Sequence, residues 1–306
     1  MTDITQRIEQ VRNDREHGSR WLVRETLLIL RDLAYATNGS SNEQDVYEAG
    51  RTLSQARPSM AALASAVGHV LTAQGGPAAM AREAERLLHE YDTATTRIAA
   101  YAKPLLHGTI MTDSISGTVI DVLAANSLAI EHVITLEGRP RYEGREMART
   151  LQQKGLTVTL ITDAQADIFM PQCESVVVGA DSILANGDVL NKAGTALLGW
   201  SAQGHAVPFY VLCETLKISS QHWQDGAEQW QTNLALLEEK EGTEVLEHPI
   251  EGVTVRNFYF DRTPYALVTK VITEQGIIGQ QEIAALAAQV EHNKQEYEQL
   301  WPLHLD

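Results

Sequence analysis

The segment 175–219 constrains the fold of this chain more than any other. An apolar run at its start ends in Gly-Ala-Asp, with the acid at Asp181, and a second apolar run precedes Lys217. Between the runs, Asn191 and Lys192 open a stretch with helical spacing. This order predicts a strand–helix–strand unit of a parallel sheet. It places an acid, an amide and two lysines near the carboxyl ends of neighbouring strands, where open α/β sheets bind ligands.

The overall charge limits the kinds of partner that the chain can have. Its 306 residues carry a net charge of −16, which argues against a nucleic-acid surface because such surfaces are basic. A phosphate site would therefore have to be a local cluster of cations and backbone N–H groups. No apolar run reaches the roughly 18 residues that span a membrane, and the polar N-terminus does not resemble a signal peptide. We therefore expect no membrane partner.

The cysteine content suggests where the protein is located. Cys173 and Cys213 have no metal-ligand spacing, so we expect reduced thiols, no metal and a cytoplasmic protein. The sequence contains no glycine-rich nucleotide loop, zinc-protease motif or serine-hydrolase motif. No cofactor is therefore predicted.

The pattern of apolar residues changes near residues 102–104. Residues 1–103 have helical spacing throughout, with breaks at 38–42 and 75–77 and a helix expected to start at Pro58. Residues 104–306 alternate strand-length apolar runs with helical stretches, which predicts an α/β domain with a doubly wound parallel sheet. We expect its strands over 108–112, 133–136, 157–161, 175–178, 209–212 and 253–258, and its helices over 117–128, 142–154, 165–170, 191–203 and 280–299.

Small hydroxyl residues follow the first expected strand. The loop 112–117 contains Ser114 and Ser116 and opens a helix, so its free backbone N–H groups are suited to hold an anion. Taken alone, this loop is explained more simply by an ordinary helix cap. The case for a small-molecule pocket comes from three such loops, after 112, 136 and 178, meeting at one edge of the sheet.

Several arginines are further candidates for a phosphate site. Arg139 follows the second expected strand, where it can hold a phosphate or pair with Glu137 on the surface. Arg57 precedes the helix expected at Pro58, and Gly18 and Arg20 precede the first long helix. An arginine at a helix start is also common on ordinary surfaces.

The same motifs resemble those of a known protein family. The block GADSILANGDVLNKAGT at 179–195 is similar to the Gly-Ala-Asp to Asn-Lys-x-Gly-Thr block of the translation initiation factor 2B alpha/beta/delta subunits. The segments 137–140, 260–264 and 272–276 are also similar, and the likeness runs from about Gly18 to Ile278. That family includes isomerases of ribose 1,5-bisphosphate and methylthioribose 1-phosphate. The resemblance implies an N-terminal helical domain, a Rossmann-like C-terminal domain and a homodimer formed through the C-terminal domains.

The chain departs from the enzymes of this family at a catalytic position. Those enzymes are known for a cysteine in a Thr-His-Cys loop and the acid of Gly-Ala-Asp, whereas this chain has Thr112-Asp113-Ser114 and retains Asp181. A thiol, with a reference pKa of about 8.5, exchanges protons near neutrality. A serine hydroxyl does so only when a base activates it. Two further departures put His17 where the enzymes have arginine, and Glu143 where the methylthioribose enzyme has glutamine.

Three hypotheses follow. The first is binding of a phosphorylated sugar or nucleotide in the cleft between the two domains, without isomerase chemistry. The second is an aldose–ketose isomerase of the ribose 1,5-bisphosphate type, with Asp181 as base and Asp113 or Ser114 as the second catalytic group. The third is a translation-factor-like assembly subunit that makes protein contacts through the acidic, Trp-bearing segment 221–247, which we interpret as a helix with a packing stripe or a partner surface. The predicted ligand-binding residues are Gly18, Arg20, Arg57, Ser114, Ser116, Arg139, Asn191, Lys192 and Lys217.

Overall fold

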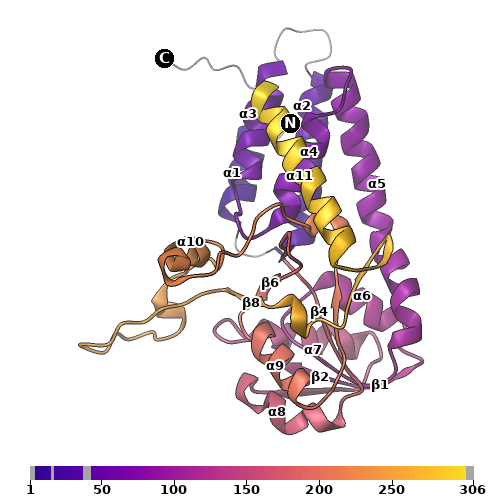
Figure 1. Ribbon diagram of the computed structural model, residues 1–306, viewed down its shortest axis with the longest axis vertical. Coiled ribbons are helices and arrows are strands. Elements are labelled where there is room, and N and C mark those ends of the chain that lie inside the picture. The colour runs from indigo at the N-terminus through magenta and orange to yellow at the C-terminus, as the bar shows by residue number, and fades with distance from the viewer. Residues whose placement is uncertain (1–3, 15–16, 37–42, 301–306) are drawn as a thin grey trace.

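The N-terminal part of the chain forms a lobe of helices (Figure 1). The computed structural model describes residues 4–14, 17–36 and 43–300, so the break expected at 38–42 lies outside the described residues. The helices are α1 (Ile4–Asn13), α2 (Ser19–Ala36), α3 (Glu43–Ser54), α4 (Ala61–Leu71) and α5 (Pro77–Ala102). The helix expected at Pro58 begins three residues later, at Ala61.

Helix α2 shows how the sequence builds this lobe. Its buried residues include Leu22, Leu27, Ile29 and Leu30, which recur at helical spacing and so form one apolar face. This face packs against α4 and α5. Helix α5 contributes to two cores: residues between Met80 and Tyr91 belong to the helical core, whereas its last turns belong to a core beneath the sheet. One continuous helix therefore connects the two cores.

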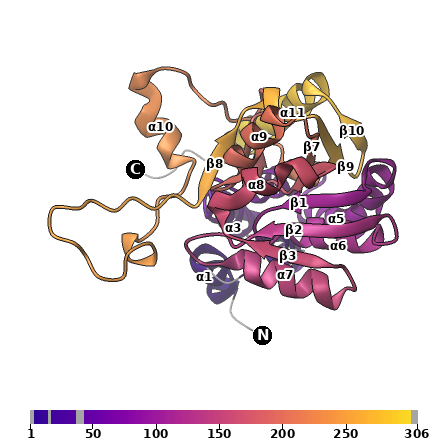
Figure 2. The same ribbon diagram turned by 90° about the horizontal axis from the view of Figure 1, so that it is seen from below.

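Within the described residues, seven strands form the main sheet in the order β10-β9-β7-β4-β1-β2-β3. All neighbours pair in parallel except β10, which is antiparallel to β9. Helices cover both faces (Figure 2), as the expected doubly wound α/β class requires. The strands are β1 (Gly108–Thr112), β2 (Ile130–Leu136), β3 (Val158–Ile161), β4 (Ser175–Val178), β7 (Phe209–Leu212), β9 (Lys270–Thr273) and β10 (Gly276–Ile278), and the helices are α6 (Gly117–Ala125), α7 (Glu143–Gln153), α8 (Ala166–Phe169) and α9 (Thr195–Gly204).

The strand order reverses between β1 and β4. From β1 the chain winds outward through β2 and β3, and then returns to β4 on the other side of β1. The loops that follow β1 and β4 therefore separate and leave a crevice between them, which is the usual ligand site in this kind of sheet.

Two predicted elements are wrong. Asn191 and Lys192 do not open a helix: they end strand β6 (Val189–Lys192), which pairs with β5 (Ser182–Ile183) and β8 (Phe260–Thr263) in a small antiparallel sheet. Gly194 turns the chain with a φ of 116°, and Asp261 accepts the N–H groups of Gly194 and Ala196, so the helix starts at Thr195 instead. The strand expected over 253–258 is not formed; the next strand is β8.

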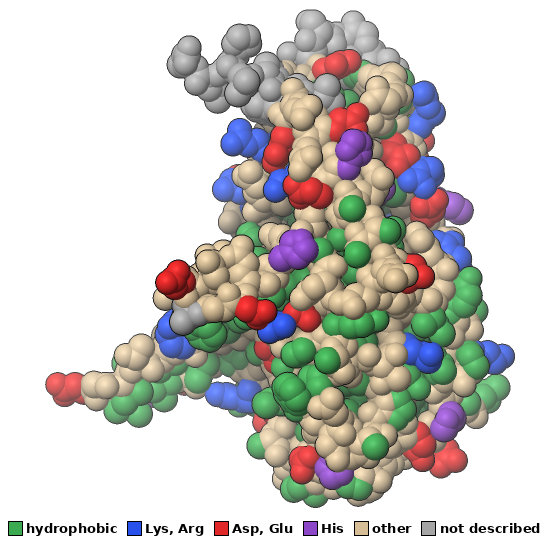
Figure 3. Space-filling model, viewed as in Figure 1, with side chains coloured by type: hydrophobic (Ala, Val, Ile, Leu, Met, Phe, Trp, Pro, Cys, Tyr) green, Lys and Arg blue, Asp and Glu red, His purple; other side chains and the backbone are tan. Residues whose placement is uncertain are grey.

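Residues 221–258, here called the arm, project from the body between β7 and β8 (Figures 1 and 2). The interpretation of 221–247 as a helix is also wrong, because the only α-helix in the arm is α10 (Trp230–Ala235). The alternative interpretation, a partner surface, stays a prediction. At its base, Leu234 and Leu237 pack into a small cluster with residues of β6 and β8. Farther out, Trp230, Ile250 and Val253 are exposed, and apolar side chains are visible along the projection in Figure 3.

The chain ends in α11 (Gln280–Leu300), which leaves the sheet and lies along the helical lobe (Figure 1). It packs against α4, where Gly68 leaves room for Asn293. None of the helices within 4–14, 17–36 and 43–300 combines the length and the apolar character needed to cross a membrane.

Candidate functional site

A cavity lies at the crevice between β1 and β4 and is closed on one side by the helical lobe. We call it the interlobe cavity. It is lined by the loops after β1 and β4, the end of β6, the start of α7 and the turn before α2. Of the residues predicted from the sequence, it is bordered by Gly18, Arg20, Asp113, Ser114, Ser116, Asp181, Asn191, Lys192 and Lys217.

Asp113 is a buried acid at the base of this cavity. Burial raises its pKa to about 7, although the hydrogen bond from Thr195 opposes the rise. Its Oδ2 lies 2.6 Å from the Thr195 hydroxyl, and Oδ1 has no hydrogen-bond partner among the described residues. Asp113 therefore holds its proton far more readily than an exposed aspartate.

The surroundings of Thr195 also favour a neutral Asp113. The hydroxyl accepts a hydrogen bond from Asn191 Nδ2 at 2.9 Å and lies 2.7 Å from the Lys192 carbonyl oxygen. A hydroxyl has one proton and two lone pairs. Its single proton can go to Asp113 or to the Lys192 carbonyl oxygen. When it goes to the carbonyl, Asp113 must be protonated to donate to the hydroxyl. The predicted ligand Asn191 is thus occupied with supporting Thr195.

Asp181 presents a carboxylate to the cavity. Its backbone N–H is bonded to Leu190, but no described side chain donates a hydrogen bond to the carboxylate. Burial raises its pKa to about 6, a rise that Lys217 opposes and Glu238 and Glu143 increase. The pKa of this carboxyl group is therefore close to neutral pH, and its oxygens are free to accept a hydrogen bond from a ligand hydroxyl.

Two buried lysines provide the positive charge. Lys192 Nζ lies 3.2 Å from Glu143 Oε1 and over the ring of Tyr259, 5.2 Å from its centroid. Lys217 Nζ lies 3.6 Å from Glu214 Oε2. Burial alone would lower the pKa of Lys217, but the carboxylates of Glu214 and Asp181 outweigh it and raise the pKa. The ammonium group of Lys217 therefore remains charged beside the cavity.

The loop after β1 brings a helix start to the cavity. Ser116 caps α6, its Oγ accepting from the Val119 N–H at 3.4 Å. Ser114 adopts a left-handed φ of 53°, which is unusual for a residue with a side chain. Gly179, at the end of β4, passes so close that a Cβ there would lie 2.8 Å from Ser116 Oγ. The glycine of the Gly-Ala-Asp motif is thus needed because a larger residue would collide with the serine that caps α6.

Three arginines predicted for the site are bonded to other residues or lie outside this cavity. Arg20 borders the cavity, but its guanidinium donates to Asp121 at 2.8 Å and Thr95 at 2.7 Å. Arg139 is not among the lining residues: it donates to the Tyr142 hydroxyl and to the Val245 carbonyl. Arg57 lines a neighbouring cavity between α4 and α11.

Sequence reasoning missed two residues that line the site or support it. Tyr259 places its ring beside Lys192, and Thr195 joins Asp113 to Asn191. Thr195 has a sequence signal, since a small hydroxyl residue after glycine is typical of a helix start. Tyr259 has none, because it enters the site through the pairing of β6 with β8 from nearly 70 residues away.

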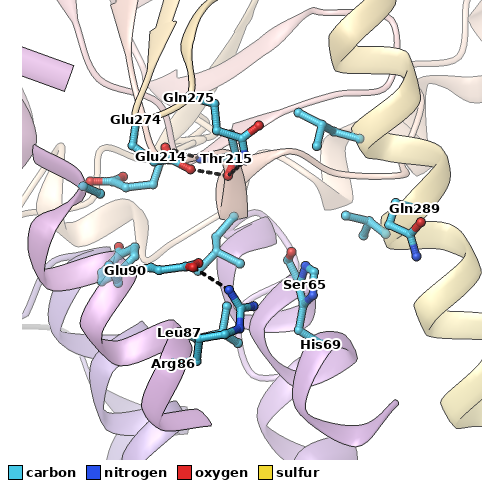
Figure 4. Close-up of a pocket in the computed structure, with 15 residues that line it drawn as sticks. Ser65, His69, Arg86, Leu87, Glu90, Glu214, Thr215, Glu274, Gln275 and Gln289 are labelled. Atoms are coloured by element: carbon cyan, nitrogen blue, oxygen red, sulfur yellow. Dashed lines mark hydrogen bonds and ion pairs between the residues drawn. The ribbon is translucent and has the colours of Figure 1, made fainter. Parts of the chain in front are cut away.

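A second cavity is lined in part by Glu214 (Figure 4). It is bounded by α4, α5, α11 and the turns after β7 and β9, and its charged side chains include Glu90, Glu274 and Arg86. Arg86 is occupied by Glu83 and Glu90, so carboxylates dominate. This cavity is therefore unsuited to an anion. Among the described residues, no group of His, Cys, Asp and Glu is arranged to hold a metal ion.

Comparison with known proteins places the chain in a family. Residues 15–280 match the model of the initiation factor 2 subunit family. A translation initiation factor eIF-2B subunit 2-like protein of Pyrococcus furiosus is 31% identical, covering 89% of this chain and 94% of the relative. The ribose 1,5-bisphosphate isomerase of Archaeoglobus fulgidus is 30% identical, covering 91% of this chain and 90% of the enzyme.

Solved structures agree. The eIF-2B structure from Pyrococcus horikoshii superposes with a TM-score of 0.75 at 28% identity, covering 91% of this chain and 97% of that one. The 5-methylthioribose 1-phosphate isomerase from the same organism has the same fold, with a TM-score of 0.71 at 23% identity over 95% of this chain and 88% of that one. The chain belongs to the initiation factor 2 subunit family.

Proposed function

We propose that this protein binds a phosphorylated sugar or a nucleoside monophosphate in the interlobe cavity, without the proton exchange of the isomerases. The observation that carries the proposal is the grouping of Lys192, Lys217, Asp181 and the capped start of α6 around one cavity. Relatives with isomerase activity act on phosphorylated sugars, and this charge pattern suits the same class of ligand.

Each part of such a ligand has a matching group. A phosphate is bound by the two lysine ammonium groups together with Ser114 and Ser116 and the free N–H groups of α6. The carboxylate of Asp181 accepts hydrogen bonds from sugar hydroxyls. Since the whole chain is strongly acidic, this local cluster is what makes anion binding favourable.

Ser114 is the reason for proposing binding without turnover. It stands where the resemblance places the enzymes' cysteine, and no described residue accepts a hydrogen bond from its hydroxyl. A serine hydroxyl with no adjacent base is a poor proton-transfer group. The arrangement therefore holds a sugar phosphate but lacks the thiol that would exchange its protons.

Calorimetry tests the binding. Ribose 1,5-bisphosphate, ribose 5-phosphate and adenosine monophosphate are titrated into the wild-type protein, with unphosphorylated ribose as the control. We expect at least one phosphorylated compound to bind and ribose to show no measurable heat. Equal binding of ribose, or no binding by any phosphorylated compound, would contradict the proposal.

The second candidate is a ribose 1,5-bisphosphate isomerase, and one observation favours it. Asp113 and Asp181 border the same cavity, and their pKa values, about 7 and about 6, suit an acid–base pair working near neutral pH. Incubation with ribose 1,5-bisphosphate, followed by NMR for the ketose, separates the two candidates. If the wild-type protein forms the ketose and Asp181→Asn does not, the protein is an isomerase and the proposal of binding without turnover is wrong.

Pairing of two copies through the sheet lobe, and a cytoplasmic location, also remain proposals. The exposed Trp230, Ile250 and Val253 of the arm give a projecting apolar surface that suits contact with a protein partner, as the assembly hypothesis requires. Relatives of this fold do assemble, as in the tetrameric eIF2B beta–delta complex of C. thermophilum. Light scattering coupled to size-exclusion chromatography measures whether this chain is a dimer.

A further inference from the structure

Arg57 is a buried cation that is incompletely bonded. Its side chain is 13% exposed, and its Nε has no hydrogen-bond partner among the described residues. Its ion pair, between Nη1 and Glu238 Oε2, measures 3.7 Å, which is longer than a hydrogen bond. Much of the hydrogen-bonding capacity of this guanidinium is therefore unused.

The partner of Arg57 is held in an unfavourable backbone conformation. Glu238 has a φ of 48°, in the left-handed region that is strained for a residue with a side chain. Its carboxylate contacts the Ser59 hydroxyl and lies 2.9 Å from Lys240 Nζ. An anion at the base of the arm is thus surrounded by two cations and a hydroxyl, the same kinds of group that bind phosphate.

This cluster lies directly beside the interlobe cavity. The Ser182 hydroxyl, next to Asp181, donates to the Ser59 carbonyl oxygen and accepts from the Ala61 N–H. Met60 lines both the interlobe cavity and the cavity that contains Arg57. The charge of Glu238 also helps to raise the pKa of Asp181, after burial. The loop 57–61 therefore borders both the interlobe cavity and the cavity that contains Arg57.

We propose that Glu238 is an internal anion that occupies Arg57 and Lys240 and that a ligand phosphate in the interlobe cavity replaces it. This inference rests on the proposed function. The displaced carboxylate leaves the cluster, and Arg57 then pairs with the phosphate. The exchange is favoured because the pair with Arg57 is long and the backbone at Glu238 is strained. Both features offset part of the cost of breaking the contacts of Glu238 with Ser59 and Lys240.

Such an exchange has two consequences. It favours ligands that carry a negative charge. When Glu238 leaves, Arg57 and Lys240 lose the carboxylate that neutralised them, and a neutral sugar has no charge to replace it. It also links ligand binding to the arm, because the Glu238 carbonyl accepts the Tyr259 N–H at 3.1 Å and Tyr259 lines the cavity. Glu238 thus determines both affinity and selectivity for phosphorylated ligands.

The test compares two neighbouring glutamates. Glu238→Gln keeps the shape of the side chain and removes the charge, and Glu239→Gln is the matched control because Glu239 is exposed and pairs with Arg256. Calorimetry with ribose 1,5-bisphosphate should show Glu238→Gln binding on the order of fivefold to tenfold tighter than wild type, because the competing anion is gone. Glu239→Gln should match wild type.

Two further variants make the result decisive. Glu238→Gly also removes the anion and suits the positive φ, so it should bind more tightly even if Glu238→Gln folds poorly. In an Arg57→Ala background the gain should disappear. If wild type binds and neither Glu238 variant binds more tightly, the inference is wrong and the proposed function stands. If wild type and every variant fail to bind, the proposed function is wrong and the inference with it.

Discussion

The hydroxyl of Thr195 lies 2.6 Å from the carboxyl group of Asp113 and connects it to Asn191 and to the Lys192 carbonyl. This contact joins the loop after β1 to the start of α9, two segments that are more than 80 residues apart. It explains why a buried acid is tolerated at the base of the site: a protonated Asp113 completes the hydrogen bonds of Thr195.

The first prediction concerns stability and pH. Because the pKa of Asp113 is about 7 in the folded protein and its ordinary value is 3.8, the folded state binds the proton more tightly than the unfolded state. This contribution to stability is present at low pH and is lost as pH rises from about 4 to 7. Asp113→Asn, which stays neutral, should exceed wild type in stability at pH 8 by on the order of a few kcal/mol.

Urea unfolding of both proteins at pH 4 and pH 8 measures this difference. The two proteins should be nearly equal in stability at the lower pH. An Asp113→Asn protein that is less stable than wild type at pH 8 would show that Asp113 is ionised in the folded state.

The second prediction concerns the missing thiol. Ser114→Cys should give the protein measurable conversion of ribose 1,5-bisphosphate to the ketose, because a thiol of reference pKa about 8.5 exchanges protons that a hydroxyl does not. NMR follows the product, and Asp181→Asn in the same background should abolish it. Absence of turnover in Ser114→Cys, with binding intact, would show that more than the thiol is missing.

The third prediction concerns the cations. Lys192→Met should weaken binding of inorganic phosphate by at least about tenfold, since a hydrogen bond to a charged group contributes roughly 1.5–3 kcal/mol. Lys154→Met is the control, because Lys154 is a surface lysine that pairs with Asp121 at 3.4 Å. Calorimetry or a thermal shift in phosphate measures both, and equal losses in the two variants would exclude a specific site at Lys192.

The fourth prediction concerns a close approach of backbone to side chain. Gly179→Ala places a methyl group 2.8 Å from Ser116 Oγ, so the serine must move and its cap bond to α6 weakens. We expect a loss of about 1 kcal/mol in unfolding free energy and weaker phosphate binding. Gly204→Ala, which has open space around it, should show neither loss when both are measured by urea unfolding and calorimetry.

The sequence was sufficient for features that depend on local pattern. Apolar runs marked β1, β4 and β7, and so predicted that Ser114, Asp181 and Lys217 lie at one edge of the sheet, where the structure brings them together. Asn191 and Lys192 also reach the cavity, but from a strand. A four-residue strand has too few residues for its period to differ clearly from a helix start.

Features that depend on distant pairing could not be predicted. Residues 189–192 form a strand because they pair with β8, for example Lys192 with Phe260. The sequence near residue 192 contains no pattern that predicts this distant partner. Arg57 was expected beside the ligand, but Glu238 from the arm holds it in the adjacent cavity. The course of the arm cannot be derived from periodicity, because it contains only one short α-helix.

Because α5 belongs to both hydrophobic cores, it limits how this chain can be divided into fragments that fold. Its middle, with Leu87 and Tyr91, is part of the helical core, and its end, with Ile98 and Ala102, covers the sheet. A fragment that begins after residue 103 would leave the apolar surface beneath Ile98 in contact with water. Any portion of the chain that contains the folded sheet must therefore include the last turns of α5, which cover its core.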